Sequence, residues 1–533
     1  MKKMVSLFLA LVMSVLCLGN AAFAENTEVN FTPGTYEGHA NSTGGEIVVE
    51  VTVSEHAIES IEVVTCNDTD GVKNVPLERI PSQIVEHQSL NVDAVTGATL
   101  TSLFLKNAIT DAVKQATDDV SGLNEKVEYK APAQSDMEAD VVVVGGGNAG
   151  LTAAAQASSL GLNVVLIERN GFLGGTALLS DGVLTLSAVD YLSADRENYD
   201  LFLNEIGAEH YRVDFEYLGA INSMYYYVPE EGRSKMATGI ATLEAFATDK
   251  GVTILKDTSV TGLLIEDGAV TGVTAEPRGQ EAFTVKAKAV ILASGGFARN
   301  KDLIAEYMPQ YTDVIPCNLS GSKGEAVDWV KELNAKLYNM DCDLQWYPAS
   351  EGLMAHSFGS TAGIYVDPEG MIINETNAYS DTARDAFHKL GQRTTYYQLL
   401  TQEMAEGAEM MEDVEDSLRA GRGFEFASLA EVAEAYGLTN VVETLTSLGY
   451  AEDSTYYVCP VRPYMYSTYG GIEIDSEGRV LNTDDEAIPG LYAVGEVTGS
   501  ADFKAFGIYL GQLGQGMQQS LIAGRTVADD IQK

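Results

Sequence analysis

The sequence predicts a mixed α/β chain in which a small α+β domain precedes a larger Rossmann-like sheet domain, itself interrupted by an inserted α+β cap. Three observations support this fold class. The length of 533 residues exceeds one ordinary hydrophobic core. Residues 35–64 show strand-like alternation of apolar and polar side chains. A buried-strand sequence that leads into a glycine-rich turn starts at Asp140, and α/β patterning returns at residues 470–533.

Residues 1–24 have the composition of a signal peptide. Lys2 and Lys3 precede an apolar run, and Ala22 and Ala24 form an A-x-A cleavage pattern. We therefore expect export, with the mature protein extracellular, at the cell surface or periplasmic. No later stretch reaches the roughly 18 uninterrupted apolar residues of a membrane span.

The composition argues against several classes of partner and cofactor. The chain has 77 acidic and 33 basic residues, which give a formal charge of −44. Nucleic acid is therefore disfavoured as a partner, because phosphate backbones demand Lys and Arg. The cysteines outside the leader (Cys66, Cys317, Cys342 and Cys459) form no C-x-x-C pair. No metal site is predicted, and any electron transfer is expected to use organic cofactors.

The small domain is expected at residues 27–118. Strand-like alternation is clearest at 46–53 and 58–64, whereas residues 76–118 have a helical pattern. Residues 119–137 lack periodicity and contain a proline, so they are predicted to form a linker.

The larger domain is divided along the sequence. Its first part is expected at residues 138–344 and its second part at 461–533, with the cap at 345–460 between them. The cap is richer in helical and polar stretches, with acidic helix candidates at 400–420 and 428–447. This layout is typical of a sheet domain interrupted by an insertion.

A dinucleotide-binding fingerprint follows the strand that begins at Asp140. Its glycines and the intervening helix-start residues are Gly145, Gly147, Asn148, Ala149 and Gly150. The first glycine permits a tight turn, the second lets the backbone approach a pyrophosphate, and the third lets helix and strand pack closely. The pyrophosphate would lie at the helix N-terminus, where free N–H groups favour anions. Glu168 ends the next strand, where a carboxylate binds ribose hydroxyls, which favours FAD or NAD over NADP.

Three further segments resemble one flavoprotein family. Residues 174–176 resemble a loop along the flavin pyrophosphate, residues 289–297 an A-x-G-G-F strand, and residues 488–499 a C-terminal strand with a flavin-contacting Glu. The family comprises soluble fumarate reductases, succinate dehydrogenase flavoprotein subunits and 3-ketosteroid dehydrogenases, and the resemblance spans roughly residues 138–533. It implies a non-covalent FAD. The residues it adds to the FAD site are Gly174, Gly175, Thr176, Ser294, Gly295, Gly296 and Glu496.

Residues 93–101 resemble the flavinylation motif D-x-x-[ST]-G-A-[ST]-x-T of FMN-binding domains in sodium-pumping quinone reductases. The resemblance implies that a flavin transferase links FMN to the Thr99 hydroxyl through a phosphoester. Small neighbours expose that hydroxyl, and the following helix start can receive a phosphate. The alternative is a plain Thr/Gly turn before a helix. A tethered FMN beside an FAD domain implies electron flow from FMN to FAD and then to a substrate.

The resemblance also suggests a proton donor. Arg384 lies in a segment similar to the family's T-R-D, whose Arg protonates the alkene while FAD supplies hydride. The alternative is an Arg that pairs with Asp385 on a helix. The acidic and basic members of the family's proton relay correspond to His356 and Gly359.

The family's substrate clamp is altered in this chain. Its two His residues correspond to Tyr347 and Ser467, and its Arg corresponds to Gln512. Fumarate is therefore disfavoured, because a dicarboxylate needs charge-assisted partners. Tyrosines beside these positions favour an enone or an aryl-conjugated alkene, since they offer stacking area and a hydroxyl. They are Tyr347, Tyr464, Tyr466, Tyr469, Tyr509 and, less directly, Tyr225, Tyr226 and Tyr227.

These features favour an exported ene-reductase of the fumarate reductase type that serves anaerobic respiration and extracellular electron transfer. Its expected partners are a small alkene, a flavin transferase, and a membrane electron donor or a quinol or flavin shuttle. One alternative is a dehydrogenase of the 3-ketosteroid type that runs in the oxidative direction. Another is a non-catalytic extracellular flavin electron carrier.

Overall fold

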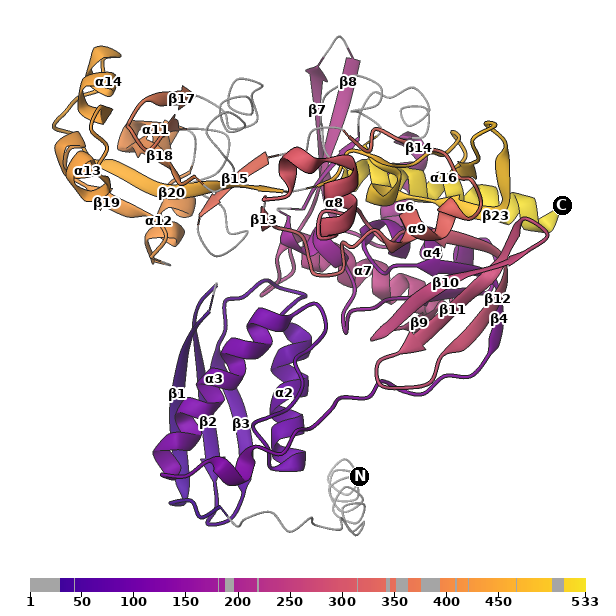
Figure 1. The fold of residues 1–533 in the computed structure, drawn as a ribbon, viewed down its shortest axis with the longest axis horizontal. Helices are drawn as coiled ribbons and strands as arrows, with labels where there is room; N and C mark the ends of the chain where they lie inside the picture. Colours follow the sequence, from indigo (N-terminus) through magenta and orange to yellow (C-terminus); the bar gives the residue numbers. More distant parts are fainter. Residues whose placement is uncertain are drawn as a thin grey trace, which may run out of the picture.

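The computed structural model describes residues 29–533 except 43, 181, 187–195, 218–219, 314, 342–345, 351–362, 375–393, 408–409, 420, 466 and 501–511. Figure 1 shows the small N-terminal domain in indigo, the sheet domain in magenta and yellow, and the cap mostly in orange. In the described residues, no helix is both long and apolar enough to cross a membrane.

The small domain is an antiparallel three-stranded sheet covered by two helices. Its strands pair in the order β1-β2-β3, and the helices contact the sheet. Alternate residues of β2, from Ile47 to Val53, are buried, which confirms the alternation seen in the sequence. The elements are β1 (Gly34–Ser42), β2 (Gly45–Val53), β3 (Ile58–Thr65), α2 (Asn74–His87), α3 (Thr99–Ala116) and, after them, η1 (Ser121–Leu123).

The sheet domain is built on eight strands, of which β23, β12, β4, β5 and β9 run parallel. The second half of β4 consists of four valines, all buried, because both faces of the sheet are covered there. Val141 and Val143 enter the core on one face, and Val142 and Val144 enter the core on the other. The strands are β4 (Met137–Val144), β5 (Val164–Ile167), β9 (Thr253–Leu255), β10 (Thr258–Glu266), β11 (Ala269–Pro277), β12 (Phe283–Leu292), β22 (Arg479–Leu481) and β23 (Ala487–Ala493).

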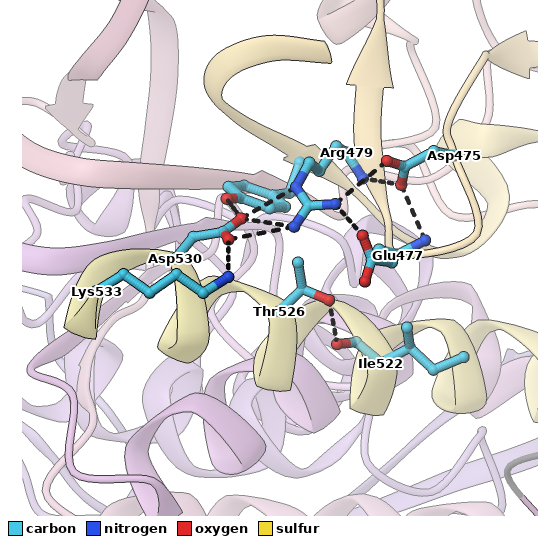
Figure 2. A network of polar contacts seen from close by, with 8 residues as sticks. Asp475, Glu477, Arg479, Ile522, Thr526, Asp530 and Lys533 are labelled. Atoms are coloured by element: carbon cyan, nitrogen blue, oxygen red, sulfur yellow. Dashed lines mark hydrogen bonds and ion pairs between the residues drawn. The ribbon is translucent and has the colours of Figure 1, made fainter.

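The C-terminal helix α16 (Leu513–Gln532) packs against α4 (Asn148–Ser159). Its far end is tied to the sheet by Arg479, whose Nη2 lies 2.9 Å from an oxygen of Asp530 and which also pairs with Asp475 and Glu477 (Figure 2). The other elements of the domain are η2 (Gly175–Leu179), β6 (Val183–Leu186), α6 (Arg196–Glu205), β7 (His210–Tyr217), β8 (Ala220–Tyr227), α7 (Lys235–Asp249), α8 (Lys301–Tyr307), η3 (Pro309–Tyr311), α9 (Glu325–Lys331), β14 (Leu337–Tyr338), β21 (Gly471–Ile472) and η4 (Gly495–Thr498).

The cap is organised around a sheet whose longest strand is β20 (Tyr456–Met465). This strand of the cap sheet extends beyond the expected boundary at 460/461. The helix candidate at 400–420 is divided into α11 and α12, and the one at 428–447 into α13 and α14. The remaining elements are β13 (Ile315–Pro316), β15 (Trp346–Ser350), β16 (Ile364–Val366), β17 (Ile372–Asn374), β18 (Tyr396–Thr401), β19 (Phe424–Phe426), α11 (Gln402–Gly407), α12 (Met411–Arg419), α13 (Leu429–Tyr436) and α14 (Val441–Ser447).

Candidate functional site

A cavity opens at the carboxyl ends of the parallel strands β4, β5, β12 and β23, where ligands of α/β sheets bind. Its empty volume is about 1230 Å³, including the part that is open to solvent. Thirteen of the residues selected from the sequence line it, although they come from segments up to hundreds of residues apart. They are Gly145, Gly147, Asn148, Ala149, Glu168, Gly174, Gly175, Thr176, Ser294, Gly295, Ser467, Glu496 and Gln512.

The glycine-rich turn places the N-terminus of α4 at the cavity. Gly147 is the N-cap of this helix and lines the cavity, and a Cβ added to it would meet only the Gly174 carbonyl oxygen, at 3.9 Å. Gly150 faces the sheet instead, and its added Cβ would lie 1.9 Å from the Gly145 carbonyl oxygen. The second glycine therefore leaves room for a ligand, while the third is required for helix–strand packing.

Glu168 is held in a fixed orientation at one end of the cavity. Its carboxylate accepts hydrogen bonds from the backbone N–H of Gly146 at 2.6 Å and of Asn170 at 2.8 Å. Burial raises the pKa of this carboxyl, and the two N–H groups oppose that shift. An oriented carboxylate of this kind can accept hydrogen bonds from ribose hydroxyls.

A second carboxyl, that of Glu496, lies at another part of the cavity wall. Its Oε1 accepts a hydrogen bond from the Thr468 N–H at 3.1 Å, and burial raises its pKa to about 7. Ser467 is the residue before Thr468 in the chain. The side-chain amide of Gln512 donates a hydrogen bond to the Thr468 carbonyl at 3.4 Å. Gly296 does not line the cavity but packs against this group, since an added Cβ would lie 2.4 Å from Glu496 Oε1.

Several buried polar atoms of the cavity wall have no hydrogen-bond partner among the described residues. They are Asn148 Oδ1, Ser294 Oγ and Ser467 Oγ. Buried polar groups are normally hydrogen-bonded, so these atoms indicate a polar ligand. Together with the glycine turn and Glu168, they fit a bound FAD, whose isoalloxazine accepts and donates hydride.

The attachment loop of the small domain, residues 93–99, presents the Thr99 side chain. Thr99 begins α3 and is exposed, whereas Ala98 before it is buried. The Ser102 hydroxyl closes the loop by donating to the Ala98 carbonyl at 2.7 Å and accepting from the Val95 N–H at 3.1 Å. An accessible hydroxyl on a braced turn suits phosphoester attachment of FMN.

The family described as "FAD binding domain" matches residues 140–205 and 186–504. The chain belongs to the FAD binding domain family. The "FMN-binding domain" family matches residues 43–117, which include Thr99. The predicted fold class and both flavins, FAD and covalent FMN, are thus confirmed, and the protein is a flavin-dependent oxidoreductase of this family.

The chain is similar to several reductases. Urocanate reductase of Eggerthella lenta is 27% identical, over 87% of this chain and 87% of its own length. NADH:acrylate oxidoreductase of Vibrio harveyi is 25% identical over 89% of this chain, which spans 59% of that longer protein. Among solved structures, the open conformation of a flavocytochrome c3 fumarate reductase has a TM-score of 0.62 at 22% identity, covering 74% of this chain and 78% of its own.

Some residues expected in the substrate site are not placed there by the structure. Arg384, His356, Tyr466 and Tyr509 lie outside the described residues. The backbone of Tyr347 is in β15, opposite Tyr464 of β20. Tyr469 is buried but does not line the cavity, and Tyr225 and Tyr227 pack in the core of the sheet domain.

Other residues of the cavity wall were not singled out from the sequence. Asn170, Thr258, Val260 and Trp329 line the cavity, and so does Arg169, which pairs with Glu325 at 2.6 Å. Asn170 could have been suspected, because it lies two residues after the acid that ends the second strand. Thr258 and Val260 belong to β10 and Trp329 to α9, elements that have no motif of their own.

Proposed function

We propose that this flavoprotein is an exported ene-reductase. Electrons would pass from FMN on Thr99 to FAD and then, as hydride, to an activated C=C bond of an enone or an aryl-conjugated alkene. The observation that supports this substrate class is that Ser467 and Gln512, which the sequence resemblance aligns with the family's clamp, line the same cavity as the FAD fingerprint.

The charge of the cavity wall disfavours a dicarboxylate. Among the described residues, Arg169 is the basic side chain of the wall, and it is already paired with Glu325. Glu496 adds an acidic group near Ser467 and Gln512. Without charge-assisted partners, each carboxylate contact would be weaker by about 1.5–3 kcal/mol, or roughly tenfold to a hundredfold in affinity. The urocanate reductase relative acts on an aryl-conjugated alkene, which supports this class.

The proton would come from Arg384, whose position in the T-R-D-like segment supports that role. The leader-like residues 1–24 support export, in which case a covalent link would keep FMN from being lost. We infer that a flavin transferase attaches it and that a membrane donor, or a quinol or flavin shuttle, reduces it.

A substrate panel tests this proposal. The mature protein, loaded with both flavins, would oxidise reduced methyl viologen in the presence of benzalacetone, cinnamate, urocanate, a 3-ketosteroid or fumarate. We expect turnover with the aryl-conjugated alkenes, its loss in Arg384→Ala, and its retention in Arg212→Ala, a matched control at an exposed arginine of β7. Best turnover with fumarate would refute the substrate class, and no turnover with any alkene would refute the reductase.

A further inference from the structure

The attachment loop is bound by an arginine of the sheet domain. The two ends of the Arg278 guanidinium contact three atoms of the loop. Its Nη2 donates to an Asp93 carboxylate oxygen at 2.9 Å, and its Nη1 donates to the Ala94 carbonyl at 2.9 Å and to the Thr96 hydroxyl at 3.0 Å. Asp93 and Thr96 are also fixed positions of the flavinylation motif. Two of the side chains that define the motif, those of Asp93 and Thr96, are therefore occupied within the same chain.

A second ion pair joins the same two domains. Arg79 of α2 donates to both oxygens of Asp257, at 3.1 and 2.7 Å. The Asp257 side chain is 3% exposed, so this is a buried, bidentate contact. Asp257 has a φ of +51°, in a turn between β9 and β10 where its N–H donates to the Asn170 carbonyl. Through Arg79, the turn thus connects α2 to the segment that starts at Asn170.

The segment 170–178 separates the attachment loop from the FAD cavity. On one side it lines the cavity through residues including Asn170 and Thr176. On the other side, Phe172 and Leu178 share a core cluster with Val95 and other residues of the small domain. The fit is close, because a Cβ added to Gly97 would lie 2.5 Å from Asn170 Oδ1.

We propose that this face of the sheet domain, formed by Arg278, Asp257 and the segment 170–178, is a docking site for the attachment loop that competes with the flavin transferase. In the transfer, the Thr99 oxygen bonds to the FMN phosphorus of FAD, the bond from that phosphorus to the bridging oxygen breaks, AMP leaves, and the hydroxyl proton passes to a base of the transferase. A transferase that reads Asp93 and Thr96 requires the undocked domain. Thr99 itself is exposed in the docked state, so a domain that already bears FMN can still dock.

This inference rests on FMN attachment at Thr99, and the variants that test docking leave the sequence of the small domain unchanged. Purified full-length chain lacking FMN is mixed with a flavin transferase, FAD and Mg²⁺, and covalent flavin is followed by intact mass. The variants are Arg278→Ala and Asp257→Asn, with Arg212→Ala as an exposed arginine control. Asparagine tolerates the positive φ of residue 257.

We expect flavinylation of both docking variants to be faster than that of the wild type and of Arg212→Ala. The expected factor is about tenfold, because loss of a charge-assisted contact shifts an equilibrium by at least roughly that factor. Equal or slower rates in both variants, at unchanged FAD content and melting temperature, would overturn the docking proposal. Absence of covalent flavin in the wild type, or its persistence in Thr99→Ala, would instead overturn the attachment site.

Discussion

Two alanine substitutions at the start of α4, at Gly147 and Gly150, distinguish cofactor binding from packing. Gly147 has φ −69°, which alanine adopts freely, and its added Cβ has only one neighbour, at 3.9 Å. Gly147→Ala is therefore expected to leave the protein without FAD as stable as the wild type, or more stable by about 0.4–1 kcal/mol through the unfolded state. Gly150→Ala places a methyl 1.9 Å from the Gly145 carbonyl oxygen, which requires the helix to move.

The two variants should fail in different ways. In Gly147→Ala the methyl enters the space that the pyrophosphate needs and moves it away from the backbone N–H groups of the turn. Loss of one hydrogen bond to a charged group weakens FAD binding by roughly tenfold to a hundredfold. In Gly150→Ala the overpacked helix costs about 1–3 kcal/mol or more before any FAD is added.

Calorimetric titration with FAD and thermal unfolding of the FAD-free proteins measure these effects separately. We expect Gly147→Ala to melt like the wild type but to bind FAD weakly, and Gly150→Ala to melt at a lower temperature. Wild-type FAD affinity in Gly147→Ala would refute the assignment of the pyrophosphate to this turn. An unchanged melting temperature in Gly150→Ala would refute the packing argument.

Three further outcomes follow from the site. Burial raises the pKa of Glu496 from 4.5 to about 7, so the FAD-free fold should lose stability as pH rises from about 4.5 to 7. The loss would approach 3 kcal/mol, at about 1.36 kcal/mol per pKa unit, and melting curves of Glu496→Gln should lack that slope. Thr99→Ser should retain covalent flavin by mass spectrometry and Thr99→Ala should lose it, whereas an unmodified Thr99→Ser would contradict a simple hydroxyl requirement. Ser467→His with Gln512→Arg should improve fumarate turnover relative to benzalacetone in the viologen assay, because the pair restores cationic partners, and an unchanged ratio would contradict the clamp alignment.

The elements with a local signal could be predicted from the sequence. The apolar run of β4 indicates burial on both faces, and the glycines after it fix where a dinucleotide lies. The convergence of Glu168, Gly295 and Glu496 on one cavity could be expected only through the family resemblance, because they come from separate parts of the chain.

The long-range contacts could not be predicted. Arg278 is an ordinary residue of a β-hairpin connection in sequence, and its contact with Asp93 depends on how two domains pack. Tyr225 and Tyr227 are candidates for the substrate site because tyrosine is amphipathic, yet tertiary packing places both in the core, Tyr225 against Tyr199 and Tyr227 beside Met517. Composition alone does not distinguish a tyrosine that packs from one that faces a ligand.

Both flavins of one chain are expected to supply electrons to an alkene, and an anaerobic titration measures how many electrons reach it. Fully reduced protein, freed of reductant, is titrated with benzalacetone and, separately, with urocanate while flavin absorbance is followed. We expect reoxidation by about two molecules of alkene per chain in the wild type and about one in Thr99→Ala, since each flavin holds two electrons and each C=C bond takes two. A wild type that stops at about one molecule, or that is not reoxidised by either alkene, would contradict it.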